Sequence, residues 1–157
     1  MSVRKVNNIC KQSRNFSFCV ALLKSSPATD LVTLTQYTIN VARVNITNTI
    51  KLIKLLISQS ARDPKANNHY ASCLVHFNYD EGALGQVRYA EELLKKRDYQ
   101  GVGVAATAIL TYVEDCISGE SPSDPPYPDH SKLPKYAHFN DMLSLNGKNN
   151  LHENINI

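Results

Sequence analysis

Four cysteines are the residues whose number and spacing say most about the chemistry of this chain. Cys10, Cys19, Cys73 and Cys116 lie in a sequence of 157 residues, and no two of them form a Cys-x-x-Cys pair. An even count without that spacing favours disulfides over a zinc site, and disulfides indicate an oxidising compartment. Four reduced thiols in a cytosolic protein remain the alternative on these grounds alone.

The positions of the cysteines restrict the chain between them. Nine residues of continuous helix would separate the Cα atoms of Cys10 and Cys19 by roughly 13–14 Å, whereas a disulfide needs about 5.5 Å. A bridge between them therefore requires a turn, which Ser13-Arg14-Asn15 can supply. The point halfway between Cys73 and Cys116 falls beside Lys95, so a bridge there would join two antiparallel neighbouring helices.

Two other patterns resemble ligand sites but are better explained without one. His69-x3-Cys73-x2-His76 places three metal ligands on one helical face, yet zinc needs a fourth ligand or an open water position, and Cys73 has a candidate partner. The run 101–106 fits the dinucleotide pattern G-x-G-x-x-A, but no strand precedes it and no βαβ unit surrounds it. We expect no cofactor and no metal.

Catalytic signatures are also missing from the sequence. Neither G-x-S-x-G nor a catalytic-cysteine signature is present, and we interpret Glu91, Glu92 and Asp141 as carboxylates on solvated faces. A helical bundle can assemble an active site from scattered residues, so this absence is only moderate support. The sequence predicts a protein that is not an enzyme.

Hydrophobic periodicity predicts helices along most of the chain. A first long helix covers residues 30–60 with Thr29 or Asp30 as its cap. A second begins at Asp63-Pro64 and ends near residue 97, and a third runs from Asp98 to Gly119. Asp80, Gly82 and Gly85 weaken the second helix. The expected core stripes are Ile39, Ala42, Ile46, Ile50, Ile53 and Ile57, with Leu34, Val41, Val44, Leu52 and Leu55 beside them; Tyr70, Cys73, Phe77, Leu84, Val87 and Leu94; and Tyr99, Val102, Ala106, Leu110, Val113 and Ile117.

A short fourth helix is expected after Pro134, with Tyr136, Phe139, Met142 and Leu143 on its apolar side. The predicted fold class is all-α: an up-and-down four-helix bundle preceded by a disulfide-closed N-terminal helical hairpin. The expected organisation is a hairpin over 1–28, a bundle over 29–145 and a frayed tail over 146–157.

Composition excludes several classes of protein. No uninterrupted apolar run approaches the ~20 residues that span a bilayer, so we expect no membrane partner. The net charge of +3, with no basic run longer than residues 95–97, argues against a nucleic-acid partner. The first eight residues do not resemble a signal peptide, so secretion would require a leader that this chain does not contain.

Several of these residues occur in a combination that resembles a known family. Cys10-x8-Cys19, then Asp63-Pro64-Lys65 leading to Tyr70-x2-Cys73, then Asp98-Tyr99 and Cys116, is similar to the plant invertase and pectin methylesterase inhibitors. The resemblance covers residues 7–119. It implies an extracellular (apoplast or cell-wall), non-catalytic bundle with disulfides Cys10–Cys19 and Cys73–Cys116, which binds a carbohydrate enzyme over its active-site cleft.

The resemblance also suggests a target. Invertase-directed members can carry Pro-Lys-Phe near the start of the third bundle helix, whereas this chain has Arg97-Asp98-Tyr99, which favours pectin methylesterase over invertase. A non-inhibitory secreted bundle is the remaining alternative. The candidate target-binding residues are Tyr79, Asp80, Thr111 and Asp115, although Asp115 replaces the Thr common in pectinesterase inhibitors.

Two tripeptides match the N-glycosylation pattern. They begin at Asn15 and Asn45, in Asn15-Phe16-Ser17 and Asn45-Ile46-Thr47. Either is a candidate site only if the protein is secreted.

Overall fold

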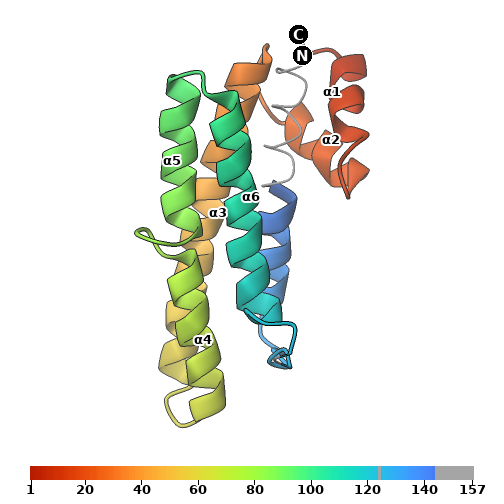
Figure 1. The fold of residues 1–157 in the computed structure, drawn as a ribbon. Helices are drawn as coiled ribbons and strands as arrows, with labels where there is room; N and C mark the ends of the chain where they lie inside the picture. Colours follow the sequence, from red (N-terminus) through yellow and green to blue (C-terminus); the bar gives the residue numbers. More distant parts are fainter. Residues whose placement is uncertain (124, 144–157) are drawn as a thin grey trace.

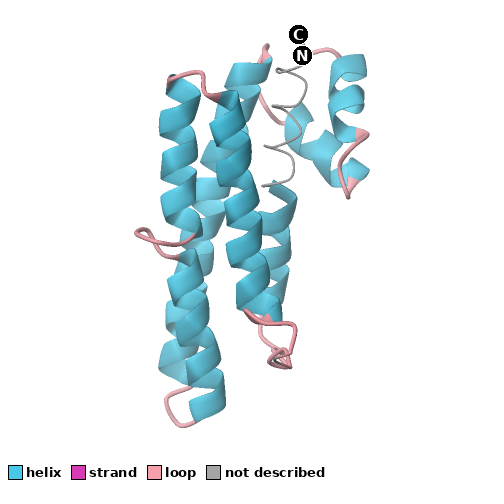
Figure 2. Cartoon of the chain, in the orientation of Figure 1, coloured by secondary structure: helices cyan, strands magenta, loops and turns pink. Residues whose placement is uncertain are grey.

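The computed structural model describes residues 1–123 and 125–143. Its helices are α1 (Val3–Cys10), α2 (Phe16–Lys24), α3 (Leu31–Gln59), α4 (Pro64–Phe77), α5 (Ala83–Lys95), α6 (Tyr99–Ser118) and a further helix over residues 133–143. The described residues contain no strand (Figure 2). In Figure 1, α3, the α4–α5 column, α6 and the 133–143 helix run up and down side by side, and the α1–α2 hairpin lies beside one end. The predicted fold class is confirmed, while the expected tail over 146–157 and the last two residues of the expected bundle lie outside the described residues.

Aspartates begin three of the bundle helices. The carboxylates of Asp30, Asp63 and Asp98 accept hydrogen bonds from the backbone N–H groups three residues later, at 2.9, 3.2 and 2.9 Å. Each satisfies a backbone donor that has no partner within the helix, and Pro64 occupies the first turn, where its missing N–H costs nothing. These are the helix starts that the sequence predicts.

The second bundle helix is divided where the sequence is weakest. It stops at Phe77 and resumes at Ala83, and residues 78–82 form a loop that protrudes from the column (Figure 1). The side-chain oxygen of Asn78 accepts hydrogen bonds from the N–H groups of Asp80 and Glu81, at 3.1 and 3.2 Å, and so fixes the turn. We call residues 78–82 the break loop.

Gly82 is expected to be intolerant of a side chain because the break loop passes so close to the end of α4. A Cβ at this position would lie 2.5 Å from the carbonyl oxygen of His76, whereas one at Gly103, inside α6, would meet nothing within 4 Å. Gly82→Ala should therefore destabilise the fold by roughly 2 kcal/mol, and Gly103→Ala should stabilise it by about 0.5–1 kcal/mol. Urea unfolding of both variants tests this pair, and a neutral Gly82→Ala would contradict the loop geometry.

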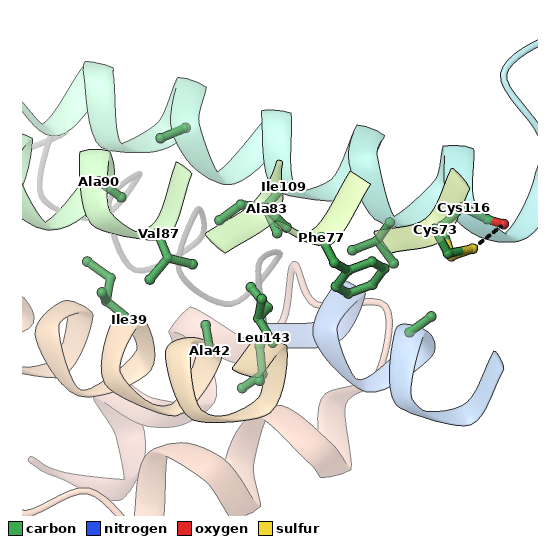
Figure 3. Packing of buried hydrophobic residues seen from close by; sticks show 14 of the residues in the cluster. Ile39, Ala42, Cys73, Phe77, Ala83, Val87, Ala90, Ile109, Cys116 and Leu143 are labelled. Atoms are coloured by element: carbon green, nitrogen blue, oxygen red, sulfur yellow. Dashed lines mark hydrogen bonds between the residues drawn. A yellow bond between two sulfur atoms is a disulfide. The ribbon is translucent and has the colours of Figure 1, made fainter. Parts of the chain in front are cut away.

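The bundle core confirms most of the residues in the predicted stripes and corrects two of them, both on α3. Its buried residues come from all four bundle helices (Figure 3), and include Ile39, Ala42, Ile46 and Ile53 of α3, Phe77 of α4, Val87 and Ala90 of α5, Val102, Ala105, Ile109 and Val113 of α6, and Leu133, Ala137 and Leu143. Val44 and Leu55, predicted beside the first stripe, are 59% and 52% exposed. The surface of α3 that packs against the other helices is therefore narrower than the two predicted stripes, which together contain eleven apolar residues.

The last described helix also has a different register from the predicted one. It begins at residue 133, and its buried positions are Leu133, Ala137, Asn140 and Leu143, while Tyr136 is 39% exposed. Asn140 is tolerated in the core because its side-chain amide donates to the hydroxyl of Thr49 at 2.9 Å. The sequence pattern missed this helix face because one of its four residues is polar.

The hairpin has a smaller core of its own. Cys10 and Cys19 form a disulfide with a Cα–Cα distance of 5.6 Å, and the turn between α1 and α2 lies at residues 11–15. Val6, Ile9 and Leu23 pack around this disulfide and against Leu31 and Leu34 at the start of α3, which attaches the hairpin to the bundle.

Helix α6 requires a correction to the expectation about membrane spans. By length and composition alone, Tyr99–Ser118 could cross a bilayer, although polar residues interrupt its apolar sequence. Within the structure, six of its residues are buried against the other bundle helices, which is also typical of a core helix.

Candidate functional site

The four predicted target-binding residues occupy two places in the structure. Tyr79 and Asp80 lie in the break loop, and Thr111 and Asp115 lie in the second half of α6. Among the described residues, no hydrogen bond, ion pair or ring contact joins the first pair to the second. The four candidate residues are thus divided between the break loop and α6.

The break loop holds Tyr79 in a defined position. Its ring is 48% exposed, and the guanidinium of Arg88 from α5 lies 4.6 Å from the ring centroid and donates to the phenol oxygen at 2.7 Å. Asp80 and Glu81 beside it are exposed. This loop thus offers an oriented aromatic ring and two solvated carboxylates.

Asp115 lines two adjacent grooves at the C-terminal end of α6. The first, of about 520 Å³, lies between α6 and the 133–143 helix and includes Glu114, His138 and Asp141. The second, of about 750 Å³, lies against α4 and includes Lys65, Asn68 and Ser72. Residues 119–123 and 125–132, which we call the strap, contribute to the walls of both grooves.

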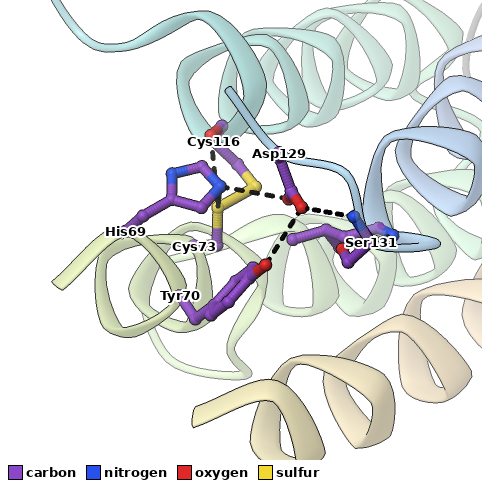
Figure 4. A network of polar contacts seen from close by, with 7 residues as sticks. His69, Tyr70, Cys73, Cys116, Asp129 and Ser131 are labelled. Atoms are coloured by element: carbon purple, nitrogen blue, oxygen red, sulfur yellow. Dashed lines mark hydrogen bonds and ion pairs between the residues drawn. A yellow bond between two sulfur atoms is a disulfide. The ribbon is translucent and has the colours of Figure 1, made fainter. Parts of the chain in front are cut away.

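The strap is attached to α4 by a buried carboxylate (Figure 4). Asp129 accepts hydrogen bonds from the Tyr70 hydroxyl at 3.0 Å and the backbone N–H of Ser131 at 2.9 Å, and its second oxygen lies 3.3 Å from Nε2 of His69. Burial raises the pKa of Asp129, but hydrogen bonding to the side chain and backbone of Ser131, to Tyr70 and to His69 together outweighs burial and lowers the pKa below its ordinary value. The ring of Tyr127 stacks on His69 with centroids 4.5 Å apart.

A second and more exposed contact lies at the other end of the strap, where the Glu120 side chain is 69% exposed. Nε2 of His76 lies 3.1 Å from a carboxylate oxygen of Glu120. His69 and His76 therefore pair with two strap carboxylates, and Cys73 between them is bonded to Cys116 with a Cα–Cα distance of 4.6 Å. The candidate metal triplet is a disulfide flanked by two histidine–carboxylate contacts, and the described residues hold no cluster with metal-ligand geometry.

The sequence reasoning missed Asp129 and Glu120 as partners of α4. The predicted third helix ends at Gly119, and nothing in the spacing of residues 119–132 indicates which α4 side chains they reach. The rejected dinucleotide pattern lies inside α6, where continuous helix leaves no phosphate-binding turn.

Asp141 and Glu91 do not lie on solvated faces as predicted. Burial, and secondarily the nearby Glu114 carboxylate, raise the pKa of Asp141 to about 6, whereas Arg14 acts in the opposite direction. Glu91 connects α5 to α3: it pairs with Arg43 and accepts a hydrogen bond from Gln36 at 3.3 Å. Glu91 thus joins two helices, whereas Asp141 is a partly buried carboxylate close to Glu114.

Asp141 should make the protein less stable as the pH rises from about 4 to 7. Its native pKa lies above the unfolded value of about 3.9, so the native state binds more protons in that interval, and the free energy of unfolding falls with pH. Allowing for partial solvent screening, Asp141→Asn should raise the free energy of unfolding by about 1 kcal/mol at pH 7.5 and should hardly change it at pH 4. Thermal unfolding between pH 4 and 8 measures this, with the exposed Glu92→Gln as control; an unchanged pH slope in Asp141→Asn would refute it.

The family is decided by comparison with known proteins. Residues 4–145 match the family described as plant invertase/pectin methylesterase inhibitor. The chain belongs to this family. The resemblance seen in the cysteine framework and in Asp63-Pro64-Lys65 is thus confirmed.

Two curated members of the plant invertase/pectin methylesterase inhibitor family are similar to this chain. A pectinesterase inhibitor of Actinidia deliciosa is 32% identical over 114 residues, which cover 71% of this chain and 60% of the relative. Pectinesterase inhibitor 2 of Arabidopsis thaliana is 27% identical over 117 residues, covering 73% and 65%. This chain spans less than two thirds of the length of either relative.

Solved structures of the family share the fold. A mutant form of a pectin methylesterase inhibitor from Arabidopsis superimposes with a TM-score of 0.80 at 23% identity, covering 94% of this chain and 95% of that one. A second Arabidopsis pectin methylesterase inhibitor gives a TM-score of 0.69 at 20% identity, with 97% of both chains covered.

The two candidate glycosylation sites differ in their surroundings. Asn15 is exposed in the hairpin turn, where its side-chain oxygen accepts from the N–H of Phe18 at 2.9 Å. Asn45 is partly buried in the middle of α3, and its side-chain nitrogen donates to the Val41 carbonyl at 3.0 Å. The Asn45 side-chain nitrogen is thus engaged within α3, whereas Asn15 is exposed in a turn.

Proposed function

We propose that this chain is a protein inhibitor of pectin methylesterase, which it binds reversibly, as a 1:1 complex, over the active-site cleft of the enzyme. The observation that carries the proposal is the family match, since both similar curated proteins are named pectinesterase inhibitors. Inhibition would then work by occlusion and would leave both proteins uncleaved.

Invertase is the alternative target within the same family. The third bundle helix begins after Arg97 with Asp98 as its cap and Tyr99 as its first residue. The Pro-Lys-Phe sequence that invertase-directed members can carry near this point is missing, which favours the esterase. Inhibition of invertase without inhibition of pectin methylesterase would reverse this choice.

The break loop and the C-terminal half of α6 are the surfaces that we assign to the target. A standard interface buries ~800 Å² on each partner, and two adjacent helical surfaces can supply that area. The oriented Tyr79 ring suits the buried centre of an interface, and Asp80 and Asp115 can accept hydrogen bonds from donors on the enzyme. Thr111, exposed one turn before Asp115, adds a hydroxyl to the same side of α6.

Charge reversal at Asp115 tests this assignment. If Asp115 is buried at the contact, Asp115→Lys should weaken inhibition of pectin methylesterase by about 1–3 kcal/mol, and raised salt should weaken the wild-type complex as well. Glu92→Lys, an equal charge change on an exposed α5 position, is the matched control. Inhibition constants measured against a panel of pectin methylesterases and acid invertases decide the target; equal constants for both variants would remove Asp115 from the site.

We further propose that the protein is secreted, with residues 1–28 as a hairpin, 29–145 as the bundle and Asn15 as its glycosylation site. Two disulfides support an oxidising compartment, and the separate core around Cys10–Cys19 supports the division. In material from a plant secretory host, we expect a glycan on Asn15 and none on Asn45, because Asn45 would have to leave its helical hydrogen bond.

A further inference from the structure

Charge is divided unevenly between the hairpin and the bundle. Five of the 17 Lys and Arg residues lie within residues 1–29, which contain no Asp or Glu, whereas residues 30–157 contain 12 basic and 14 acidic residues. The five are Arg4, Lys5, Lys11, Arg14 and Lys24, and all are exposed. Among the described residues, none of them forms an ion pair. The hairpin is therefore a cationic element on a chain that is otherwise slightly acidic.

Helix α1 arranges part of this charge in a row. Val6, Ile9 and Cys10 are buried, so the opposite side of the helix faces solvent. Arg4 and Lys11 are seven residues apart and share that outer side, roughly 10 Å from one another along the helix axis. The exposed amide of Asn8 lies between them. The outer side of α1 thus carries two cations and an amide and no carboxylate.

The other basic residues of the hairpin are partly accounted for by neighbours. Lys5 contributes to lowering the pKa of Asp30, and Arg14 opposes the rise in the pKa of Asp141. Lys24 lies in the last turn of α2, where the helix dipole favours a cation. Arg4 and Lys11 have no such role in the described structure. They are the two hairpin cations that are left to solvent in the described structure.

We propose that the outer side of α1 binds an acidic polysaccharide, namely pectin whose methyl esters have been removed. The identity of the polymer rests on the proposed function: hydrolysis of each methyl ester consumes water, releases methanol and leaves one carboxylate on the chain. The target enzyme would therefore produce a polyanion beside itself. A row of cations with an intervening amide fits a chain that repeats carboxylates and hydroxyls, and binding there leaves the break loop and α6 free.

Other polyanions suit this surface less well. An amphipathic helix binds a lipid surface by inserting its apolar side, but the apolar side of α1 is already buried against α2 and α3. Nucleic acid is disfavoured by the two disulfides and by the small number of cations in the row.

Binding of the full chain to polygalacturonate tests the proposal. Arg4→Gln/Lys11→Gln should weaken binding on the order of tenfold, because each cation near an anionic surface contributes appreciably. Lys95→Gln/Lys96→Gln removes the same charge from the exposed end of α5 and should change binding less than about twofold. Highly methylesterified pectin of equal length should bind much more weakly than polygalacturonate. Binding should fall as salt is raised.

Three results would overturn the proposal. The first is an equal loss of polygalacturonate binding in the hairpin variant and the α5 variant. The second is equal affinity for methylesterified and de-esterified polymer. The third is binding to duplex DNA, or to vesicles of anionic phospholipid, that is as tight as binding to polygalacturonate or tighter and is weakened by Arg4→Gln/Lys11→Gln. Inhibition of pectin methylesterase is measured on the same proteins with a short soluble substrate. Hairpin-dependent polymer binding without inhibition would contradict the proposed function alone, and unchanged inhibition without polymer binding would contradict this proposal alone.

Discussion

Replacing Cys73 and Cys116 together with alanine is expected to lower the free energy of unfolding by about 4 kcal/mol. The disulfide closes a loop with a sequence separation of 43, and the loss of that constraint increases the entropy of the unfolded chain. Both residues are buried, at 0% and 3% exposed, so the two alanines also leave unfilled volume between α4 and α6. For a chain of this size, the melting temperature should fall by roughly 10 °C.

The Cys10–Cys19 pair provides the internal comparison. Its sequence separation of 9 corresponds to a smaller stabilisation, about 3 kcal/mol, and the loss should be confined to the hairpin core. Urea and thermal unfolding of both double-alanine variants measure the difference, and a digest under non-reducing conditions identifies the linked peptides. Crossed pairing, or a Cys73/Cys116 variant as stable as the parent, would contradict the bundle as described.

Much of the fold could be predicted because its signals are local. Asp30, Asp63 and Asp98 each precede an apolar helical stripe, and each caps a helix in the structure. Cys73 and Cys116 lie at nearly equal distances from the α5–α6 turn, so their spacing indicates antiparallel helices. The caps depend on residues within one turn, and the spacing of the two cysteines can be counted directly in the sequence.

The break loop could not be predicted from local sequence signals alone. Asp80, Gly82 and Gly85 indicate a weak stretch of helix, yet their propensities do not say whether the helix persists or divides. The division depends on the packing of Phe77 and Ala83, both 0% exposed, on either side of the loop. Such tertiary contacts override propensity and are not encoded in a short window of sequence.

The strap could not be predicted because its contacts are long-range. Asp129 reaches Tyr70 and His69 across separations of 59 and 60 residues. A carboxylate between proline and histidine in a loop is indistinguishable, by sequence alone, from solvated Asp. The same holds for Asp141, whose burial depends on how the 133–143 helix, to which it belongs, packs beside α6.

Removing the Asp129 side chain is expected to have the second large effect, a loss of about 3 kcal/mol at neutral pH in Asp129→Ala. The carboxylate is 5% exposed and accepts hydrogen bonds from the Tyr70 hydroxyl and the Ser131 backbone. Hydrogen bonds to a charged group contribute about 1.5–3 kcal/mol, and the truncated variant also leaves the Tyr70 hydroxyl without its acceptor. Asp129→Asn keeps an acceptor oxygen and should cost less.

The pH dependence separates this role from simple packing. Because the native pKa of Asp129 lies below the unfolded value of about 3.9, its contribution is complete above about pH 5 and is lost as the pH falls through the native pKa. Unfolding at pH 7 and pH 3 should therefore show a larger cost of Asp129→Ala at pH 7 than at pH 3. Asp80→Ala, at an exposed carboxylate of the break loop, is the control, and its free energy of unfolding should remain within about 0.5 kcal/mol of the parent at either pH.

A double-mutant cycle of Tyr70→Phe and Asp129→Ala should give a coupling free energy of about 1–2 kcal/mol. If Asp129→Ala matches Asp80→Ala, or if its cost is the same at both pH values, the carboxylate does not hold the strap on α4.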